Sequence, residues 1–405
     1  MPAVENVAII GGGLAGLSLA LALHQQSISS IVYELRSEPR DLGGAITLSP
    51  NSLKILDLLG VYESVVSQGF RCNAFHFRTE NDEPFDSYEI GSEEKYGYPG
   101  LRVYRKVLIK ALLAKCTEKD IRIIFDKKFK RILSETAAGV TWEFDDGTVG
   151  TAASLVGADG IHSRVRSYLD SRAEPQFTGV VGVAATIPTD QVNIPQDYQM
   201  PVTIMNKAYG AYILAQNLPD GSEMIILKQK RSHALSRQGW EHLLTENEEC
   251  VDFLKQDAEF FPDIVRMAVA KIDPDTIFLW PFHQVPEMKQ WSSEQGRVSI
   301  IGDAAHAIPP SSGQGANQVF EDAYTFALIC GRCDSSALAQ VLPKWKEGRQ
   351  ERVNRLITLA EQMNVRRLPE GANMLSMEAI GSEDFHMDWL FKPNFEEMVQ
   401  QWMES

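Results

Sequence analysis

The sequence predicts an α/β fold with a parallel, Rossmann-type sheet, an inserted and mainly antiparallel β-sheet region, and C-terminal helices. Three observations predict it. A glycine-rich turn separates a short apolar strand from a helix near the N-terminus. Strand-like segments alternate with turn signals through the middle of the chain. A charged segment over 344–366, typical of a solvated helix, follows the last glycine-rich stretch.

The first part of the chain reads as one strand–helix–strand unit. Residues 7–10 form an apolar run that Gly11 ends, as expected of a buried parallel strand. Leucine and alanine repeat at helical spacing over 14–23, and a second strand is expected over 31–33, ending at Glu34. A βαβ unit completed within about 30 residues predicts a parallel sheet.

Four regions are expected along the chain. They are a cofactor-binding part over 1–170, a substrate-binding insert over 171–275, the rest of the cofactor-binding part over 276–345, and a C-terminal helical segment over 346–405. In the first part, helices are expected over 53–59 and 107–113, a hairpin-like excursion over 71–98, and strands over 122–125, 140–144 and 154–156. In the insert, strands are expected over 180–187, 202–205, 209–215 and 224–228, with helices over 240–270. A last buried strand over 298–301 and a helix over 318–330 complete the pattern.

Composition excludes several classes of protein. The 405 residues carry a net charge of −15, which argues against nucleic acid and against electrostatic attachment to an anionic membrane. No apolar run reaches the roughly 18 residues of a spanning helix, and no signal peptide is expected, so a cytoplasmic protein without membrane contact is predicted. The five cysteines are scattered. Cys330 and Cys333 form an isolated C-x-x-C pair, which predicts packing rather than a metal site.

The first motif that indicates chemistry is the turn over residues 11–16, a G-x-G-x-x-G between strand and helix. Gly11 allows the tight turn, Gly13 allows backbone to approach a pyrophosphate, and Gly16 allows the helix to pack closely on the strand. The helix start at Leu14 and Ala15 offers free N–H groups and a partial positive charge to phosphates. Glu34 ends the second strand, where a carboxylate binds ribose hydroxyls and repels a 2′-phosphate. A dinucleotide site with an adenosine ribose is therefore predicted.

Two later glycine-rich stretches favour FAD over NAD. One runs over 157–166 and contains Asp159, and the other runs over 302–317 and contains Asp303. An aspartate at a strand end can hold ribityl hydroxyls. The glycine-rich turn over 313–317 opens a helix, whose positive end would stabilise negative charge on the pyrimidine edge of a reduced flavin.

These motifs, in this order and with Arg105 at an R-x-x-L helix start, resemble the class A flavoprotein monooxygenases typified by para-hydroxybenzoate hydroxylase. The composition is most similar to members from fungal secondary metabolism. The resemblance implies that FAD contacts come from residues on all of these segments: Gly11, Gly13, Leu14, Ala15, Gly16, Glu34, Arg36, Ala45, Thr47, Arg105, Asp159, Asp303, Pro310, Gly313, Gly315, Ala316 and Asn317. Within that set, Ala45 and Thr47 lie in a segment that passes near the flavin, and Pro310 near its reactive face.

The resemblance also implies an activity. NAD(P)H reduces FAD, O₂ adds at flavin C4a, and the hydroperoxide hydroxylates or epoxidises an aromatic or polyketide- or alkaloid-like small molecule. Because the cofactor carries this chemistry, the protein must mainly position the substrate and exclude water. Catalytic candidates in the insert are Tyr209, Tyr212 and His283, with Lys207 as a further candidate; packing or surface roles are the alternative for each.

One departure from the family pattern affects the mechanism. Many fungal relatives carry an arginine in the first strand of the insert, and this chain has Ala184 at that position. The catalytic base is therefore left open. Two other functions also remain open: an FAD-dependent dehydrogenase or reductase without oxygen insertion, and a non-catalytic flavin-binding protein. The expected partners are the small-molecule substrate and O₂, for a monomer or homodimer.

Overall fold

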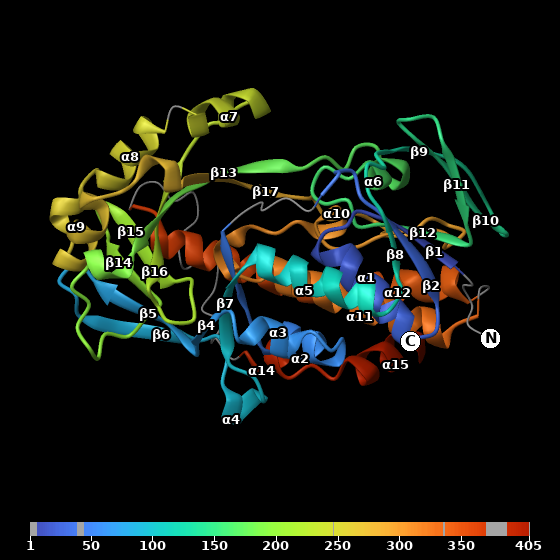
Figure 1. The fold of residues 1–405 in the computed structure, drawn as a ribbon, viewed down its shortest axis with the longest axis horizontal. Helices are drawn as coiled ribbons and strands as arrows, with labels where there is room; N and C mark the ends of the chain where they lie inside the picture. Colours follow the sequence, from blue (N-terminus) through green and yellow to red (C-terminus); the bar gives the residue numbers. More distant parts are fainter. Residues whose placement is uncertain (1–5, 39–43, 246, 335–336, 370–386, 405) are drawn as a thin grey trace.

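The computed structural model describes residues 6–38, 44–245, 247–334, 337–369 and 387–404. Figure 1 shows two regions, one around a parallel sheet and one around a larger sheet, with helices running along and between them. We call the first region the cofactor domain. The predicted α/β fold, with a Rossmann-type sheet and a mainly antiparallel second sheet, is confirmed.

The parallel sheet has the strand order β18-β12-β1-β2-β8. Its strands are short and largely apolar, as expected where helices cover both faces. In register, Ile10 lies opposite Tyr33 on one side and Gly157 on the other. The strand bounds are β1 (Asn6–Ile10), β2 (Ser29–Tyr33), β8 (Arg122–Ile124), β12 (Ser154–Gly157) and β18 (Val298–Ile300).

Helices pack on this sheet and on one another. Helix α1 (Leu14–Gln25) is apolar on every side, and each residue from Leu14 to Leu23 is buried. It packs against α11 (Gly315–Arg332), which carries a long run of buried residues. The other helical segments of this domain are α2 (Pro50–Leu58), α3 (Tyr62–Val66), α4 (Glu93–Tyr96), α5 (Arg105–Glu118), α6 (Arg164–Leu169), α10 (Asp303–His306) and the 3₁₀ turn η4 (Pro310–Ser312).

Two small antiparallel sheets complete the domain. One has the order β3-β7-β4 and consists of β3 (Ala45–Leu48), β7 (Gly100–Tyr104) and β4 (Phe70–Cys72). The other consists of β9 (Phe129–Thr136), β10 (Gly139–Phe144) and β11 (Val149–Ala152). The turn at residues 145–147 joins β10 to β11.

The larger sheet has seven strands in the order β17-β13-β16-β15-β14-β5-β6. All pairs are antiparallel except β14 with β5. The predicted insert over 171–275 contains β13 (Gln176–Pro188), β14 (Val202–Asn206), β15 (Gly210–Gln216) and β16 (Glu223–Arg231). The hairpin β5 (Ala74–Thr79) and β6 (Pro84–Glu89), and β17 (Ile277–Gln284), join from outside that range. These three strands join the sheet through hydrogen bonds to segments far away in the sequence. No local sequence pattern predicts such pairing.

The two faces of this sheet have different neighbours. Val183 and Tyr212 belong to a core shared with α8 (Glu248–Lys255) and α9 (Asp263–Ala270). On the other face, Ala184, Ala215 and Ile225 form a second cluster with Leu227 and Phe278 packed against it. We call these five residues the inner patch. The remaining segments of this region are α7 (Arg237–Thr245), which contacts α8 and β17, and the 3₁₀ turns η1 (Thr189–Gln191), η2 (Ala258–Phe260) and η3 (Pro274–Thr276).

The predicted charged helix is α12 (Leu338–Arg367), drawn in orange in Figure 1. It begins in the cofactor domain, packs against η4 and reaches β15 of the larger sheet. Two further helices, α14 (Asp388–Phe391) and α15 (Phe395–Glu404), pack back onto the cofactor domain. The expected C-terminal helical segment also includes 370–386, which lie outside the described residues. Among the helices described, none has the length and apolarity needed to cross a bilayer.

Candidate functional site

The predicted motifs meet at one edge of the parallel sheet. Gly11 and Glu34 directly follow β1 and β2, Gly157 is the last residue of β12, and Gly302 lies two residues after β18. Backbone hydrogen bonds join the segments there: Gly11 N donates to Tyr33 O at 2.8 Å, and Ala158 N donates to Ile10 O at 2.8 Å. In open α/β sheets this edge is where ligands bind.

The first glycine turn is shaped to bring backbone close to a ligand. Gly11 has φ +112°, and a Cβ there would lie 2.3 Å from Ala158 O. A Cβ on Gly16 would lie 1.9 Å from Gly11 O, so only glycine allows α1 to start this close to β1. At Gly13 the Cβ position has no atom within 4 Å. The N–H groups at Leu14 and Ala15 begin α1 without intrahelical acceptors. This open space before a helix N-terminus fits a pyrophosphate.

The carboxylate of Glu34 is held in place at the end of β2. Gly12 N donates to its Oε2 at 2.7 Å, and Arg36 N donates to its Oε1 at 3.1 Å. The predicted residue Arg36 thus contributes through its backbone, while its side chain is exposed. A fixed carboxylate at this edge fits the ribose of an adenosine.

Asp159 has a local structural partner. Its Oδ2 accepts from Arg164 N at 2.8 Å and from Val165 N at 3.2 Å, which caps the start of α6. Its Oδ1 is buried and has no hydrogen-bond partner among the described residues. Burial raises the pKa of Asp159, and the hydrogen bonds it accepts partly oppose that rise. The contacts seen are those of a turn cap, and FAD contact by Asp159 stays a prediction.

Asn317 joins the two segments expected on either side of the flavin. Its Nδ2 donates to Thr47 O at 3.1 Å and to Gly313 O at 3.0 Å. Its Oδ1 accepts from Ser49 N at 3.0 Å and from the Ser52 hydroxyl at 2.5 Å. Asn317 itself has no exposed surface; its bonds to Ser49 and Ser52 are buried, and those to Thr47 and Gly313 are partly buried. The strand that carries Ala45 and Thr47 is therefore fixed against the start of α11.

The remaining predicted FAD contacts lie around the same edge. Pro310 begins η4, Gly313 ends it with φ +67°, and Gly315 and Ala316 begin α11. Asp303 begins α10 directly after β18 and Gly302. Arg105 begins α5 and is partly buried. The structure thus brings the predicted segments together, and their individual contacts with FAD stay predictions.

A buried ionic network behind this edge escaped the sequence analysis. Glu321 and Asp322 on α11 have no exposed surface. Arg349 on α12 pairs with both, its Nε lying 2.8 Å from Asp322 Oδ1, and Arg352 pairs with Glu321 at 2.8 Å. His306 lies 2.5 Å from Asp322 Oδ2. The available signal was an adjacent pair of acids within an otherwise apolar helix.

The network reaches the cofactor edge directly. Gly302 N donates to Asp322 Oδ2 at 2.7 Å, which fixes the turn before Asp303. Burial raises the pKa values of Glu321 and Asp322, but their cationic neighbours outweigh it and lower both to about 2. Both carboxylates are therefore charged at neutral pH. They tie α11 to the glycine-rich turn.

The proposed catalytic side chains of the larger sheet have other contacts. Tyr212 donates its hydroxyl to Leu254 O at 2.7 Å, beneath α8. Tyr209 stacks on Phe260 with ring centroids 4.4 Å apart. His283 lies 5.5 Å from the ring of Phe177, and its Nδ1 is 3.1 Å from Pro281 O. Lys207 is exposed.

None of these four side chains belongs to the inner patch. Their catalytic role stays a prediction, and the contacts of these side chains do not support it.

The inner patch contacts the cofactor domain at Gly44. A Cβ on Gly44 would lie 3.2 Å from Cζ of Phe278. Gly44 directly precedes β3, which carries Ala45 and Thr47. The apolar face of the larger sheet therefore meets the strand expected beside the flavin.

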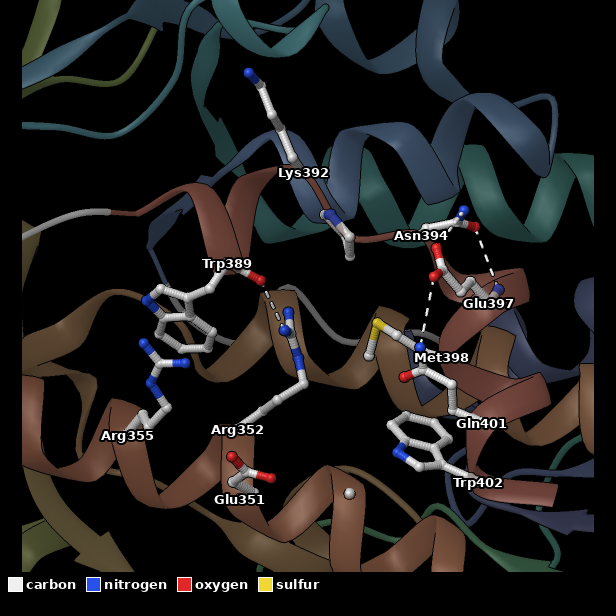
Figure 2. Close-up of a pocket in the computed structure, with 12 residues that line it drawn as sticks. Glu351, Arg352, Arg355, Trp389, Lys392, Asn394, Glu397, Met398, Gln401 and Trp402 are labelled. Atoms are coloured by element: carbon white, nitrogen blue, oxygen red, sulfur yellow. Dashed lines mark hydrogen bonds between the residues drawn. The ribbon is translucent and has the colours of Figure 1, made fainter. Parts of the chain in front are cut away.

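A separate surface groove of about 420 Å³ lies among α12, α14 and α15. Figure 2 shows Arg355 beside the indole of Trp389, with Arg352 donating to the backbone oxygen of Trp389. The guanidinium of Arg355 lies 3.9 Å from a ring centroid of Trp389. No predicted FAD contact lines this groove, and its contacts hold the C-terminal helices together. Among the described residues no His, Cys, Asp and Glu cluster could hold a metal ion.

Comparisons with known proteins agree with this geometry. The sequence profile of a family described as "FAD binding domain" matches residues 5–360. The chain is 30% identical over 356 residues to 3-amino-4-hydroxybenzoate 2-monooxygenase of Streptomyces platensis, covering 86% of this chain and 85% of that protein. It is 27% identical over 355 residues to 6-methylsalicylate 1-monooxygenase of Aspergillus terreus, covering 83% and 76%.

The fold is also similar to those of solved structures. A salicylate hydroxylase substrate complex superposes with a TM-score of 0.77 at 21% identity, covering 99% of this chain and 98% of that one. With the glycine turns and Glu34 gathered at one sheet edge, the chain belongs to the FAD-binding family of class A flavoprotein monooxygenases and is an FAD-dependent monooxygenase.

Proposed function

We propose that this enzyme uses NAD(P)H and O₂ to hydroxylate or epoxidise an aromatic or polyketide- or alkaloid-like small molecule. The observation that carries the proposal is the contact of Phe278 with Gly44. It sets the apolar inner patch against the strand of Ala45 and Thr47, where the flavin is expected. A substrate lying on the patch would have its ring beside the cofactor.

The residues at the edge fit FAD, and each has a defined task. Bound FAD supplies electron transfer from NAD(P)H and the reaction with O₂. Glu34 would hold the adenosine ribose, and the start of α1 the pyrophosphate. Asn317 holds Thr47 against the start of α11, whose positive end favours negative charge beside it. Ala184, Ala215 and Ile225 present hydrocarbon that excludes water from the substrate side.

The relatives support an aromatic substrate. The two named above, from Streptomyces platensis and Aspergillus terreus, act by their names on hydroxylated aromatic rings. The apolar inner patch, which includes the ring of Phe278, suits an aromatic ring. We also propose that the enzyme is cytoplasmic, acts in secondary metabolism and is a monomer or a homodimer, as the sequence predicts.

The test measures NADH and NADPH oxidation by the FAD-loaded chain under ¹⁸O₂, with 3-amino-4-hydroxybenzoate, 6-methylsalicylate and carboxyl-free phenols as probes. The proposed function predicts that at least one aromatic probe speeds NAD(P)H oxidation at least ten-fold and appears as product with one ¹⁸O atom. Stimulated oxidation that gives only unlabelled, dehydrogenated product would favour the dehydrogenase alternative. Purified chain without a flavin spectrum would favour a non-catalytic role.

A further inference from the structure

Arg102 is a buried arginine on the substrate side of the cofactor domain. It lies on β7, and its neighbours in sequence, Leu101 and Val103, are fully buried in the core of that domain. Because side chains alternate along a strand, Arg102 and Tyr104 point to the opposite side. There the Nε of Arg102 donates to Asn217 Oδ1, 3.0 Å away at the end of β15. Arg102 thus bridges the cofactor domain and the larger sheet with 8% of its surface exposed.

The charge of Arg102 has no acidic partner in the described part of the chain. The bond to Asn217 is the one hydrogen bond its guanidinium makes there, which leaves the terminal nitrogens Nη1 and Nη2 unbonded. Burial lowers the pKa of Arg102 to about 10, with the nearby Cys72 and Tyr104 opposing the fall. By contrast, the two buried arginines of the ionic network, Arg349 and Arg352 on α12, both pair with Glu321. A buried cation without a counterion is costly, so its retention calls for an anion that binds there.

The neighbours of Arg102 fix its orientation. Asn217 donates through Nδ2 to Tyr104 Oη at 3.3 Å and to Glu223 Oε1 at 3.1 Å. Tyr104 also donates to Glu223, at the same oxygen, Oε1. A guanidinium held by Nε presents Nη1 and Nη2 as two parallel donors, which match the two oxygens of a carboxylate.

The site adjoins the inner patch. Tyr104 also hydrogen-bonds Thr186, which lies two residues along β13 from Ala184 on the same face. Arg102 lies opposite Thr47 in the β3–β7 pair, and Thr47 is the residue that Asn317 fixes beside the expected flavin. The chain lacks an arginine at position 184, and β7 supplies a guanidinium to the same region from the other side.

We propose that Arg102 is a substrate-binding residue and that the substrate carries a carboxylate, held by Nη1 and Nη2 while its apolar body lies on the inner patch. This inference rests on the proposed function, because it uses the patch as the substrate surface. Asn217 is a positioning residue in this arrangement.

The experiment measures ligand binding to the FAD-loaded chain by perturbation of the flavin absorption spectrum. The probes are benzoate, 2-hydroxybenzoate, 4-hydroxybenzoate and 1-naphthoate, each compared with its carboxamide. In the unsubstituted chain, at least one carboxylate is expected to bind at least ten-fold more tightly than its amide. Arg102→Met should abolish that preference. Equal binding of all acids and amides, or a preference that survives Arg102→Met, overturns the proposal.

Stability separates a binding role from a structural one. Arg102→Met removes the desolvation cost of a buried cation without an acidic partner, but it also leaves Asn217 Oδ1 without its donor. Because these effects oppose each other, Arg102→Met is expected to keep FAD and to shift the melting temperature by less than about 5 °C. If it failed to fold, Arg102→Lys would decide: it keeps the charge without the paired donors, and the acid preference should fall at least five-fold. An unchanged preference in Arg102→Lys overturns the proposal.

The matched control is Arg71→Gln on the neighbouring strand β4, where Arg71 is exposed and pairs with Glu93. Its acid preference should equal that of the unsubstituted chain. Acid binding without ¹⁸O incorporation would sink the proposed function and leave this site standing. Oxygenation of a neutral phenol, without any preference for acids over amides, would overturn this site and leave the proposed function standing.

Discussion

The side-chain amide of Asn317 donates to the carbonyl of Thr47 at 3.1 Å, across a separation of 270 residues. Both residues are predicted FAD contacts, but no sequence pattern predicts that they bind each other. Asn317 uses every hydrogen-bonding capacity of its amide, with two acceptor and two donor bonds. Asn317 therefore helps to fix the position of β3 relative to α11.

Asn317→Leu keeps the volume and removes all four bonds. Each buried group left without a partner costs about 1–3 kcal/mol. We expect the melting temperature to fall and the dissociation constant for FAD, followed by flavin fluorescence, to rise at least ten-fold. Asn81→Leu, in an exposed turn, is the control and should change neither quantity. Full FAD affinity in Asn317→Leu would show that the bridge does not shape the site.

Arg349→Met breaks the buried ionic network and leaves part of the charge on Glu321 and Asp322 uncompensated. Removing one partner of a buried ion pair costs about 3–5 kcal/mol. We expect a loss of this size in the free energy of unfolding, measured with urea at pH 7. The control on the same helix is Arg355→Met, where the guanidinium stacks on Trp389 at the surface and the loss should stay below about 1 kcal/mol.

Acid should destabilise the protein through the same network. The pKa values of Glu321 and Asp322 are about 2 in the folded protein, below their ordinary values of 4.5 and 3.8. Folded-state values below the unfolded ones mean that the contribution is complete above about pH 5 and is lost as the pH falls toward 2. Thermal melts between pH 6 and 3 should show this loss. Asp322→Asn should flatten the dependence, and an unchanged slope would contradict the assignment.

Glu34→Arg should abolish FAD binding. The substitution puts a cation where Gly12 N and Arg36 N donate, and it removes the acceptor for the ribose hydroxyls. The ratio of absorbance at 450 nm to that at 280 nm reports flavin occupancy. Glu38→Arg makes the same charge change on an exposed residue four positions along and should retain FAD. Full occupancy in Glu34→Arg would contradict the placement of the adenosine.

Tyr212→Phe tests the catalytic candidates from sequence. Its hydroxyl donates to Leu254 O beneath α8, away from the inner patch, so turnover should change less than two-fold. The lost hydrogen bond should lower the free energy of unfolding by about 1 kcal/mol. A hundred-fold fall in kcat with the fold intact would restore Tyr212 as a catalytic residue.

The sequence by itself determined the class of the protein, because the necessary signals are local. The turn around Gly11, Gly13 and Gly16, with Glu34 after the next strand, predicts both the backbone geometry and the ligand from a single βαβ unit. Strands and helices followed from periodicity, and their positions agree with those of β1, α1, β2 and α11.

The tertiary structure decided which side chains face the substrate. Tyr212 and Ala184 both lie in strands that sequence places correctly, yet Tyr212 faces α8 and Ala184 faces the cofactor domain. In the sequence Arg102 is one more charged residue, and only the folded chain buries it beside Asn217, at the end of β15, without an acidic partner. Which face of a strand meets which neighbour is set by contacts between distant segments, and those contacts leave no local pattern.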